Sequence, residues 1–269
     1  MISMNMNFTW KQAETLSPGQ LAIQAVELAT KVWVQFVKFA LVSMLGAAAL
    51  GLVVIVLGAI LPAKLTLLIS FTVAVLYWSN ASLALIRLSL ALVDGKKLTL
   101  KETFAFDGKL ILTTIVAGLL FMMAVLLGTL ALVIPGLMIL IGCGYFAFIL
   151  VDKKDLGPVQ ALKASWALTN GDLLNLMLIN SAITVILYLA ILPAYEIFVV
   201  MMVLGSILSM LEIGSTVLAV IMGVISFVVG AAVICWVILV SMGAVLTGAL
   251  AYRKLSVSRA RAVEAALKA

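Results

Sequence analysis

The chain has 269 residues, of which 65% are hydrophobic and only 10% are charged, and its formal net charge is +6. A soluble domain carries about 25% charged residues, so this composition excludes an ordinary soluble fold and indicates apolar side chains that face lipid. The chain contains no His, which removes the commonest zinc ligand and the usual general base of enzymes. Cys143 and Cys235 both lie in apolar runs without C-x-x-C spacing, so we interpret them as small buried hydrophobic residues.

The N-terminal segment is polar or amphipathic and lacks the compact apolar region of a cleavable signal peptide, so none is expected. Ser17 can cap a helix, Pro18 suits a first helical position and Gln20 can complete a capping box. Beyond them, polar residues recur at spacings of three and four, as on one helical face. They are Gln20, Gln24, Glu27, Lys31, Gln35 and Lys38. The sequence therefore predicts an amphipathic helix over residues 16–38, on the cytoplasmic surface and continuous with the first span.

An apolar run of about 20 residues can cross the hydrocarbon core of a bilayer as a helix. Runs of this kind predict an all-α, polytopic membrane bundle with six transmembrane helices. They are Phe39–Leu61, Leu65–Leu92, Leu110–Ile134, Leu137–Val151, Leu173–Leu192 and Val217–Tyr252. The fourth run is short. We expect Pro135 and Gly136 to break the helix in a tight hairpin between the third and fourth spans.

Two segments near the C-terminal half are less regular. Ile197–Leu211 is apolar but short and lies between Glu196 and Glu212. We favour an interfacial or re-entrant segment on the outer side over a spanning one, because a span would export the basic C-terminal tail. The sixth run is too long for a perpendicular helix, so it must tilt, extend beyond the bilayer or bend near Gly223 or Gly230.

Basic residues are distributed unequally between the two sides that these spans define. Four gaps on one side hold nearly all of them, and the other side holds only Lys64. The four gaps contain Lys11, Lys31 and Lys38; Lys96, Lys97, Lys101 and Lys109; Lys153, Lys154 and Lys163; and Arg253, Lys254, Arg259, Arg261 and Lys268. Because cytoplasmic loops are enriched in Lys and Arg, this pattern predicts that both termini lie in the cytoplasm. Lipid headgroups, and not nucleic acid, are the expected partners of this charge.

Surface helices are also expected between the spans. Pro158–Thr169 has Val159, Leu162 and Trp166 on one face, and Asn170-Gly171 is a helix stop. Leu98–Phe106 predicts a shorter helix. Similar turns, Val93-Asp94-Gly95-Lys96-Lys97-Leu98 and Val151-Asp152-Lys153-Lys154-Asp155-Leu156, raise the hypothesis of three tandem units, each a surface helix plus a hairpin. The units would span 16–92, 98–151 and 156–252, followed by a basic tail over 253–269, with chance similarity as the alternative.

Polar residues within spans are candidates for function. Tyr77, Asn80 and Arg87 share a face of the second span that Asp94 continues. Arg87 either reaches the headgroups, pairing with Asp94, or forms with Tyr77 and Asn80 a cytoplasm-facing site for a substrate or headgroup. Asn180, Ser181, Thr184 and Tyr188 form a second polar face, for which we expect hydrogen bonds between helices, and the pairs Ala47/Gly51 and Ala244/Gly248 predict close helix packing.

Catalytic patterns are missing from the sequence. There is no phosphate-binding glycine loop, metal-ligand cluster or nucleophile–His pair. Asp152 and Asp155 could hold a metal at the surface, but a solvated turn is the favoured interpretation. We therefore expect neither an enzyme nor a cofactor or metal site.

Residues 130–178 read LALVIPGLMILIGCGYFAFILVDKKDLGPVQALKASWALTNGDLLNLML. This order of Ile-Pro-Gly, a span, an Asp turn, a Gly-Pro helix start, Ala-Leu-x-x-Ser-Trp and Asn-Gly resembles the uncharacterised YciC-like inner-membrane proteins of bacteria. It is also similar to the membrane domain that precedes some glycerophosphodiester phosphodiesterases. The resemblance implies a multi-pass protein of the bacterial plasma membrane. It also implies structural roles for Pro135, Gly136, Asp152, Pro158, Ser165 and Trp166: turn, helix start and interfacial anchor.

Two functions follow as expectations. The first is a non-catalytic accessory or scaffolding subunit that packs against other membrane proteins, favoured by scarce intramembrane charge and small loops. The alternative is a carrier, or an accessory for transport, of lipid-like or small amphiphilic substrates, with a cavity near Asn80 and Arg87. Membrane lipids are the expected partners in both cases, and the oligomeric state stays open.

Overall fold

The regular structure of the described residues is entirely helical. The computed structural model describes residues 18–153, 155–179, 181, 196, 200 and 242–268. Its labelled helices are α2 (Pro18–Ile60), α3 (Ala63–Val93), α4 (Leu100–Thr103), α5 (Gly108–Ala131), α6 (Val133–Cys143), α7 (Phe146–Asp152), α8 (Pro158–Thr169) and α11 (Ala260–Lys268). Residues 173–179 and 242–258 are also helical. The predictions for Ser17, Cys235, the segment Ile197–Leu211, a bend near Gly223 or Gly230 and most of the fifth and sixth spans lie outside the described residues.

Four helical segments in the described part of the chain are long and apolar enough to cross a membrane. They are Glu27–Ile60, Ala63–Val93, Gly108–Ala131 and Val133–Asp152. They coincide with the first four predicted spans. The prediction of an all-α chain with membrane-type helices is therefore confirmed for these residues.

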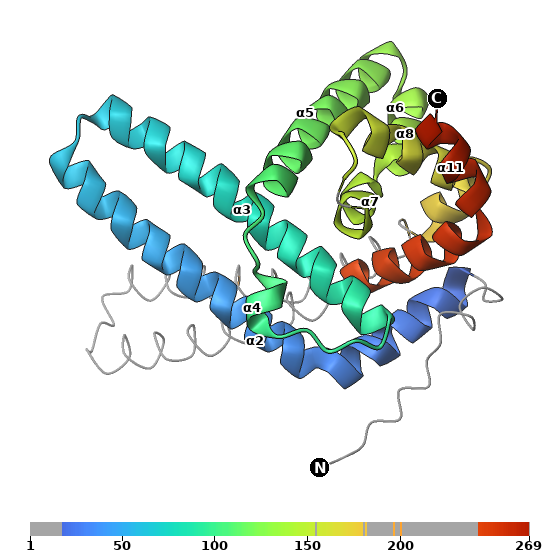
Figure 1. Ribbon diagram of the computed structural model, residues 1–269, viewed down its shortest axis with the longest axis horizontal. Helices are drawn as coiled ribbons and strands as arrows, with labels where there is room; N and C mark the ends of the chain where they lie inside the picture. Colours follow the sequence, from blue (N-terminus) through green and yellow to red (C-terminus); the bar gives the residue numbers. More distant parts are fainter. Residues whose placement is uncertain are drawn as a thin grey trace.

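Helices α2 and α3 form a long antiparallel hairpin that projects from the rest of the molecule (Figure 1). The 43 residues of α2 form one continuous helix, as expected, and at 1.5 Å per residue it is about 65 Å long. Its uncharged stretch 39–60 accounts for about 33 Å of this length, which matches the hydrocarbon core. Pro62 lies between the two helices, directly before α3. A proline disfavours helical geometry in the residue preceding it, so α2 ends before Leu61.

The small residues at the α2–α3 contact are not the predicted ones. A methyl group added at Gly51 would meet no atom within 4 Å, so the pair Ala47/Gly51 does not mark a close approach. Gly46 does, because an added methyl group there would lie 2.9 Å from the Tyr77 hydroxyl. At the second predicted pair, Gly248 has room for a methyl group at 3.4 Å from Phe148, which is ordinary contact.

Helix α3 ends at a glycine turn that fixes the position of Asp94. The Lys96 N–H donates to the Ala91 carbonyl at 2.7 Å and the Gly95 N–H to the Leu92 carbonyl at 3.2 Å. This pair of bonds is the Schellman arrangement, which needs a left-handed residue. Gly95 supplies it with a φ of 69°. Asp94 is thereby held as the C-cap residue, directly after the last residue of the helix.

The connection from α3 to α5 contains one short helix. The predicted helix over Leu98–Phe106 is wrong in length, since α4 is a single turn. Thr99 and Glu102 form a reciprocal capping box: the Thr99 N–H donates to Glu102 at 2.8 Å and the Glu102 N–H to Thr99 at 3.3 Å. These bonds, the backbone one foremost, lower the pKa of Glu102. Asp107 then caps α5 by accepting the Leu110 N–H at 3.1 Å.

Helices α5 and α6 form the second hairpin, but its turn is not at the predicted place. The chain turns at Leu132, which is extended between the two helices, while Pro135 and Gly136 lie inside the first turn of α6. A proline is tolerated there because the first N–H groups of a helix have no intrahelical acceptor. Gly136 serves close packing instead, since a methyl group on it would lie 2.8 Å from the backbone of Thr129.

The fourth span is interrupted where one uninterrupted helix is predicted. α6 ends at Cys143, and Gly144 and Tyr145 form a turn before α7 begins. Helix α8 packs against both α6 and α7 beside this break. The break between α6 and α7 therefore leaves room for α8 to pack against both helices.

The bounds of α8 agree with the prediction of Pro158–Thr169. Pro158 is its first residue, and the Gln160 side chain accepts the N–H of Gly157 at 3.0 Å. Asn170 and Gly171 end it, with a φ of 94° at Gly171. The face that packs against the protein is not the one that carries Val159. Val159 is 53% exposed, and the buried face is Ala161, Ala164, Ser165 and Leu168.

Burial in the described residues is concentrated where these helix ends meet, which we call the packed end. It comprises residues 25–36 of α2, residues 81–93 of α3, α7, α8 and residues 242–255. In α2 the buried residues are Ala25, Leu28, Ala29, Val32 and Phe36. Ile23 of the same helix is 62% exposed. The tips of both hairpins expose apolar side chains, as expected of surfaces that face lipid.

Candidate functional site

Arg87 lies in the C-terminal third of α3 and contacts the segment that follows this helix. Its Nη1 donates to the Ala105 carbonyl at 2.6 Å and to the Thr103 carbonyl at 3.5 Å. Asp94 is not its partner, so the predicted Arg87–Asp94 pair is wrong. The guanidinium instead fixes the segment 103–105 against α3, because it satisfies carbonyls at the end of α4.

Tyr77 and Asn80 lie further from the C-terminal end of α3 than Arg87, and Tyr77 contacts α2. The Tyr77 hydroxyl donates to the Ser43 carbonyl. Asn80 Oδ1 and Ser43 Oγ are both buried without a hydrogen-bond partner among the described residues. Seven residues, about 10 Å of helix, separate Asn80 from Arg87. The predicted stripe is therefore divided between a contact with α2 and a contact with the α4 loop.

The strongest polar cluster of the packed end joins Arg253 to two aspartates, and we call it the Asp94–Arg253–Asp152 cluster. Arg253 binds Asp94 with two parallel bonds, Nε to Oδ1 at 2.9 Å and Nη2 to Oδ2 at 2.7 Å. Its Nη1 reaches Asp152 Oδ1 at 3.0 Å. The Tyr252 hydroxyl donates to the other oxygen of Asp152 at 2.9 Å. Asp152 is therefore an ion-paired residue and not the solvated turn predicted for it.

Half-burial strengthens these bonds. The side chains of Arg253, Asp94 and Asp152 are 19%, 17% and 30% exposed. Burial alone would lower the pKa of Arg253, but the bond to Asp94 and the charges of both aspartates outweigh it, so the pKa is raised. The cluster holds the C-terminal ends of α3, of α7 and of the helix 242–258 together with full charge on the arginine.

A second ion pair joins the C-terminal segment to the turn after α8. Arg259 Nη2 contacts Asp172 Oδ2 at 3.0 Å, directly beside Gly171. α11, which begins one residue later, packs against α8. Two of the five basic residues of the predicted tail are thus paired with acidic residues of earlier segments.

Ser165 and Thr169 satisfy backbone groups that the break between α6 and α7 leaves without helical partners. The Ser165 hydroxyl accepts the Tyr145 N–H at 3.1 Å and donates to the Gly142 carbonyl at 3.0 Å. Thr169 donates to the same carbonyl at 2.9 Å. Both side chains are fully buried. The predicted structural role of Ser165 is thus a bond across the break, since α8 supplies what the interrupted helix cannot.

Trp166 lies against the same break. A methyl group added at Gly142 would overlap its indole ring, so the glycine is needed for the ring to approach the helix backbone. Trp166 is only half-buried, as a residue at a membrane boundary is expected to be.

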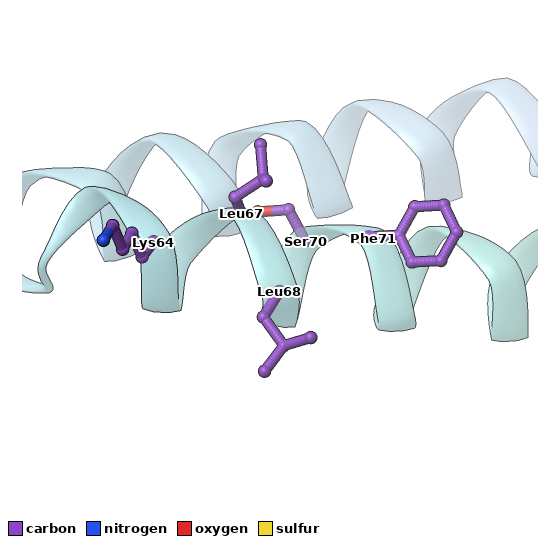
Figure 2. A pocket seen from close by; sticks show the side chains of 5 residues that line it. All are labelled: Lys64, Leu67, Leu68, Ser70 and Phe71. Atoms are coloured by element: carbon purple, nitrogen blue, oxygen red, sulfur yellow. The ribbon is translucent and has the colours of Figure 1, made fainter.

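A hollow of about 710 Å³ lies beside the first half of α3, with Lys64, Leu67, Leu68, Ser70 and Phe71 along it. Figure 2 shows that these side chains come from one helix and that Leu67 and Leu68 point to opposite sides. Ser70 donates to the Thr66 carbonyl at 2.6 Å. No polar groups converge here in the described part of the chain, and a binding site normally has a few that do.

The described residues contain no group of three or more side chains able to hold a metal ion. Comparison with family models, curated proteins and solved structures found no match to the chain.

The structure brings together only some of the site residues predicted from sequence. The Asp94–Arg253–Asp152 cluster was missed, although the similarity of the Asp94 and Asp152 turns was a signal of their equivalence.

Proposed function

We propose that the chain is a multi-pass plasma-membrane protein that acts without catalysis as an accessory or scaffolding subunit. One observation carries the proposal: Arg87, Arg253 and Arg259 are all engaged by groups of the same chain. Charge beside the spans therefore holds segments of the protein together. Apolar side chains meanwhile cover the outward faces of both hairpins, where lipid or another membrane protein packs.

The proposal includes the topology of six spans with both termini in the cytoplasm. The packed end supports it, because Asp94 and Asp152 bring the Lys-rich turns that follow α3 and α7 to the same end of the molecule. Lys64 lies at the opposite tip of the α2–α3 hairpin. This sidedness agrees with positive charge retained in the cytoplasm.

The proposal also includes a bacterial inner-membrane location and membership of the YciC-like family. Its support is the motif of residues 130–178 and the structural use of Pro158 and Ser165 as a helix start and a bond across the helix break. The use of Pro158 agrees with the helix start that the resemblance implies.

Site-specific photocrosslinking in living cells tests the scaffolding role. A photoreactive phenylalanine would replace Leu67 or Leu126, which are 75% and 62% exposed on the two hairpins. Leu83, with 0% exposure, is the matched control position. A subunit predicts a discrete protein adduct of constant mass at one hairpin and none from Leu83. Adducts with lipid alone at every exposed position would refute the role.

A carrier of lipid-like or small amphiphilic substrates is the second candidate. It is favoured by the unpartnered Asn80 Oδ1 and Ser43 Oγ between α2 and α3, since polar groups in hydrocarbon are costly to leave unpaired. In this case Asn80→Ala and Arg87→Ala would each abolish uptake of an amphiphile by cells. Full uptake by both variants would remove the candidate.

A further inference from the structure

A cavity of about 270 Å³ lies at the packed end, where α7, α8 and the C-terminal helices meet. Its apolar lining includes Ile149, Leu168 and Val263, and its polar lining residues are Asp152, Lys153, Tyr252 and Ser256. Its volume is just below the range of about 300–1,000 Å³ typical of ligand pockets. The cavity therefore suits a small polar group attached to an apolar one.

Asp152 and Lys153 bring opposite charges to this cavity without pairing with each other. Asp152 pairs with Arg253 at 3.0 Å, while Lys153 has no ion-pair partner among the described residues. Asp94 and Asp152 together share the single charge of Arg253, so the charges of these three side chains sum to −1. A ligand with both signs of charge would satisfy the two lining residues at once.

Asp152 retains capacity to bind. A carboxylate has about four lone-pair positions, and the bonds from Arg253 and Tyr252 use one position on each oxygen. The remaining positions accept N–H donors. A primary ammonium group provides such donors, whereas a trimethylammonium group does not.

The cavity lies at the membrane boundary. Asp152 is the last residue of the fourth candidate span, Val133–Asp152. A ligand at this depth would place its polar group among the lipid headgroups and its apolar part toward Ile149 and Leu168.

We propose that this cavity binds the phosphoethanolamine zwitterion, with its ammonium group at Asp152 and its phosphate at Lys153. The ligand is either the headgroup of a phosphatidylethanolamine lipid or the free phosphate ester. The proposal is independent of the scaffolding role, because it concerns a different surface from the hairpin faces that the crosslinks probe.

The test measures lipid adducts of the full-length protein in mild detergent by native mass spectrometry. The probes are phosphatidylethanolamine, phosphatidylcholine and phosphatidylglycerol with the same acyl chains. We expect phosphatidylethanolamine to bind at least about tenfold more tightly than the other two, which is the effect of one charge-assisted contact. Equal binding of phosphatidylethanolamine and phosphatidylcholine would overturn the proposal.

Three variants locate the site. Lys153→Gln removes the phosphate partner and Ala260→Leu fills the cavity. Neither changes the Asp94–Arg253–Asp152 cluster. Lys163→Gln is the matched control, because Lys163 is exposed on α8 and does not line the cavity. The first two should lose the preference for phosphatidylethanolamine and the control should keep it. Unchanged preference in Lys153→Gln, or the same loss in all three, would overturn the assignment.

Competition with soluble O-phosphoethanolamine separates the two sources of the ligand. Displacement of the bound lipid by the free ester means that the headgroup alone is recognised. Retention of the lipid at a large excess of ester means that the acyl chains contribute and that the ligand is the lipid. Either result, with the variant pattern above, supports the site.

Discussion

Arg253 is the residue through which the packed end is connected. Its guanidinium has a fork of donors in fixed geometry, which matches the carboxylate of Asp94 with two bonds and leaves a third nitrogen for Asp152. A lysine would supply the same charge from one point. The geometry therefore requires arginine specifically, and not simply a cation.

Replacing Arg253 should destabilise the folded protein by about 2–3 kcal/mol, below the 3–5 kcal/mol of a fully buried pair because the cluster is partly exposed. Arg253→Gln leaves two aspartates unpaired, and Arg253→Lys should recover part of the loss. Thermal unfolding in detergent measures both. The triple change Arg253→Met, Asp94→Asn and Asp152→Asn removes the buried charge altogether and should be closer to the native protein than Arg253→Gln. An Arg253→Gln protein that melts like the native one would contradict the role of the cluster.

The sequence is sufficient to predict which residues lie at the helix ends, but not which residues they contact. The Asp94 and Asp152 turns look alike along the chain, yet Arg253 lies 159 and 101 positions away from them. The sequence suggested Arg87 as the partner of Asp94 because both lie on one helical face. The backbone carbonyls of the α4 loop bind Arg87 instead. The pattern of side chains along a sequence does not indicate where a backbone carbonyl will lie.

At the scale of elements, α8 completes the interrupted fourth span. The hydrogen bonds from Ser165 and Thr169 replace those that α6 and α7 lose at Gly144 and Tyr145. A surface helix thereby becomes part of the packing of a membrane segment, which explains why its buried face is made of small residues and not of Val159.

Substitutions at Ser165 and Thr169 should differ in effect. Ser165→Ala leaves the buried Tyr145 N–H unpaired and should destabilise the protein by about 1–3 kcal/mol. Thr169→Val should have a smaller effect, because the Gly142 carbonyl keeps its bond from Ser165. Ser256→Ala, which removes a bond to a local carbonyl only, is the control. Thermal unfolding of the variants gives the order, and a larger effect of Thr169→Val would contradict this account of the break.

The glycines of the two hairpins give a matched pair of substitutions. Gly136→Ala should separate α5 from α6, because the new methyl group lies 2.8 Å from the backbone of Thr129. Gly51→Ala meets no atom within 4 Å and should be neutral or slightly stabilising, since alanine has the higher helix propensity. The measurement is the amount of folded protein extracted from membranes and its melting temperature. Equal behaviour of the two variants would show that the α5–α6 contact is not close.

The same pair shows the limits of prediction for these elements. Apolar runs were sufficient to predict both hairpins, and the helix stop at Asn170-Gly171 indicated where α8 ends. The turn between α5 and α6 was predicted at Pro135-Gly136, because proline usually ends a helix. At the third position of a helix, however, the N–H that proline lacks would have no intrahelical acceptor. The choice between ending and beginning a helix depends on tertiary contacts such as that of Gly136 with Thr129.

At the scale of the whole molecule, the central feature is that polar and apolar side chains gather at opposite ends of the described chain. Polar clusters, surface helices and most buried residues of the described chain gather at the packed end, and the hairpin tips expose apolar side chains. The uncharged stretches of α2, of α3, of α5 and of α6 taken together with α7 are each long enough for the hydrocarbon core. A bilayer therefore fits between the packed end and the tips in one direction.

Cysteine labelling in intact cells tests this orientation most directly. In a chain whose two native cysteines are replaced by serine, single cysteines would be introduced at Lys64, in the tip of the α2–α3 hairpin, and at Lys97, in the exposed turn after α3. We predict that a membrane-impermeant maleimide labels position 64 in intact cells and position 97 only after the membrane is opened. Labelling of position 97 in intact cells, with position 64 protected, would contradict the proposed topology.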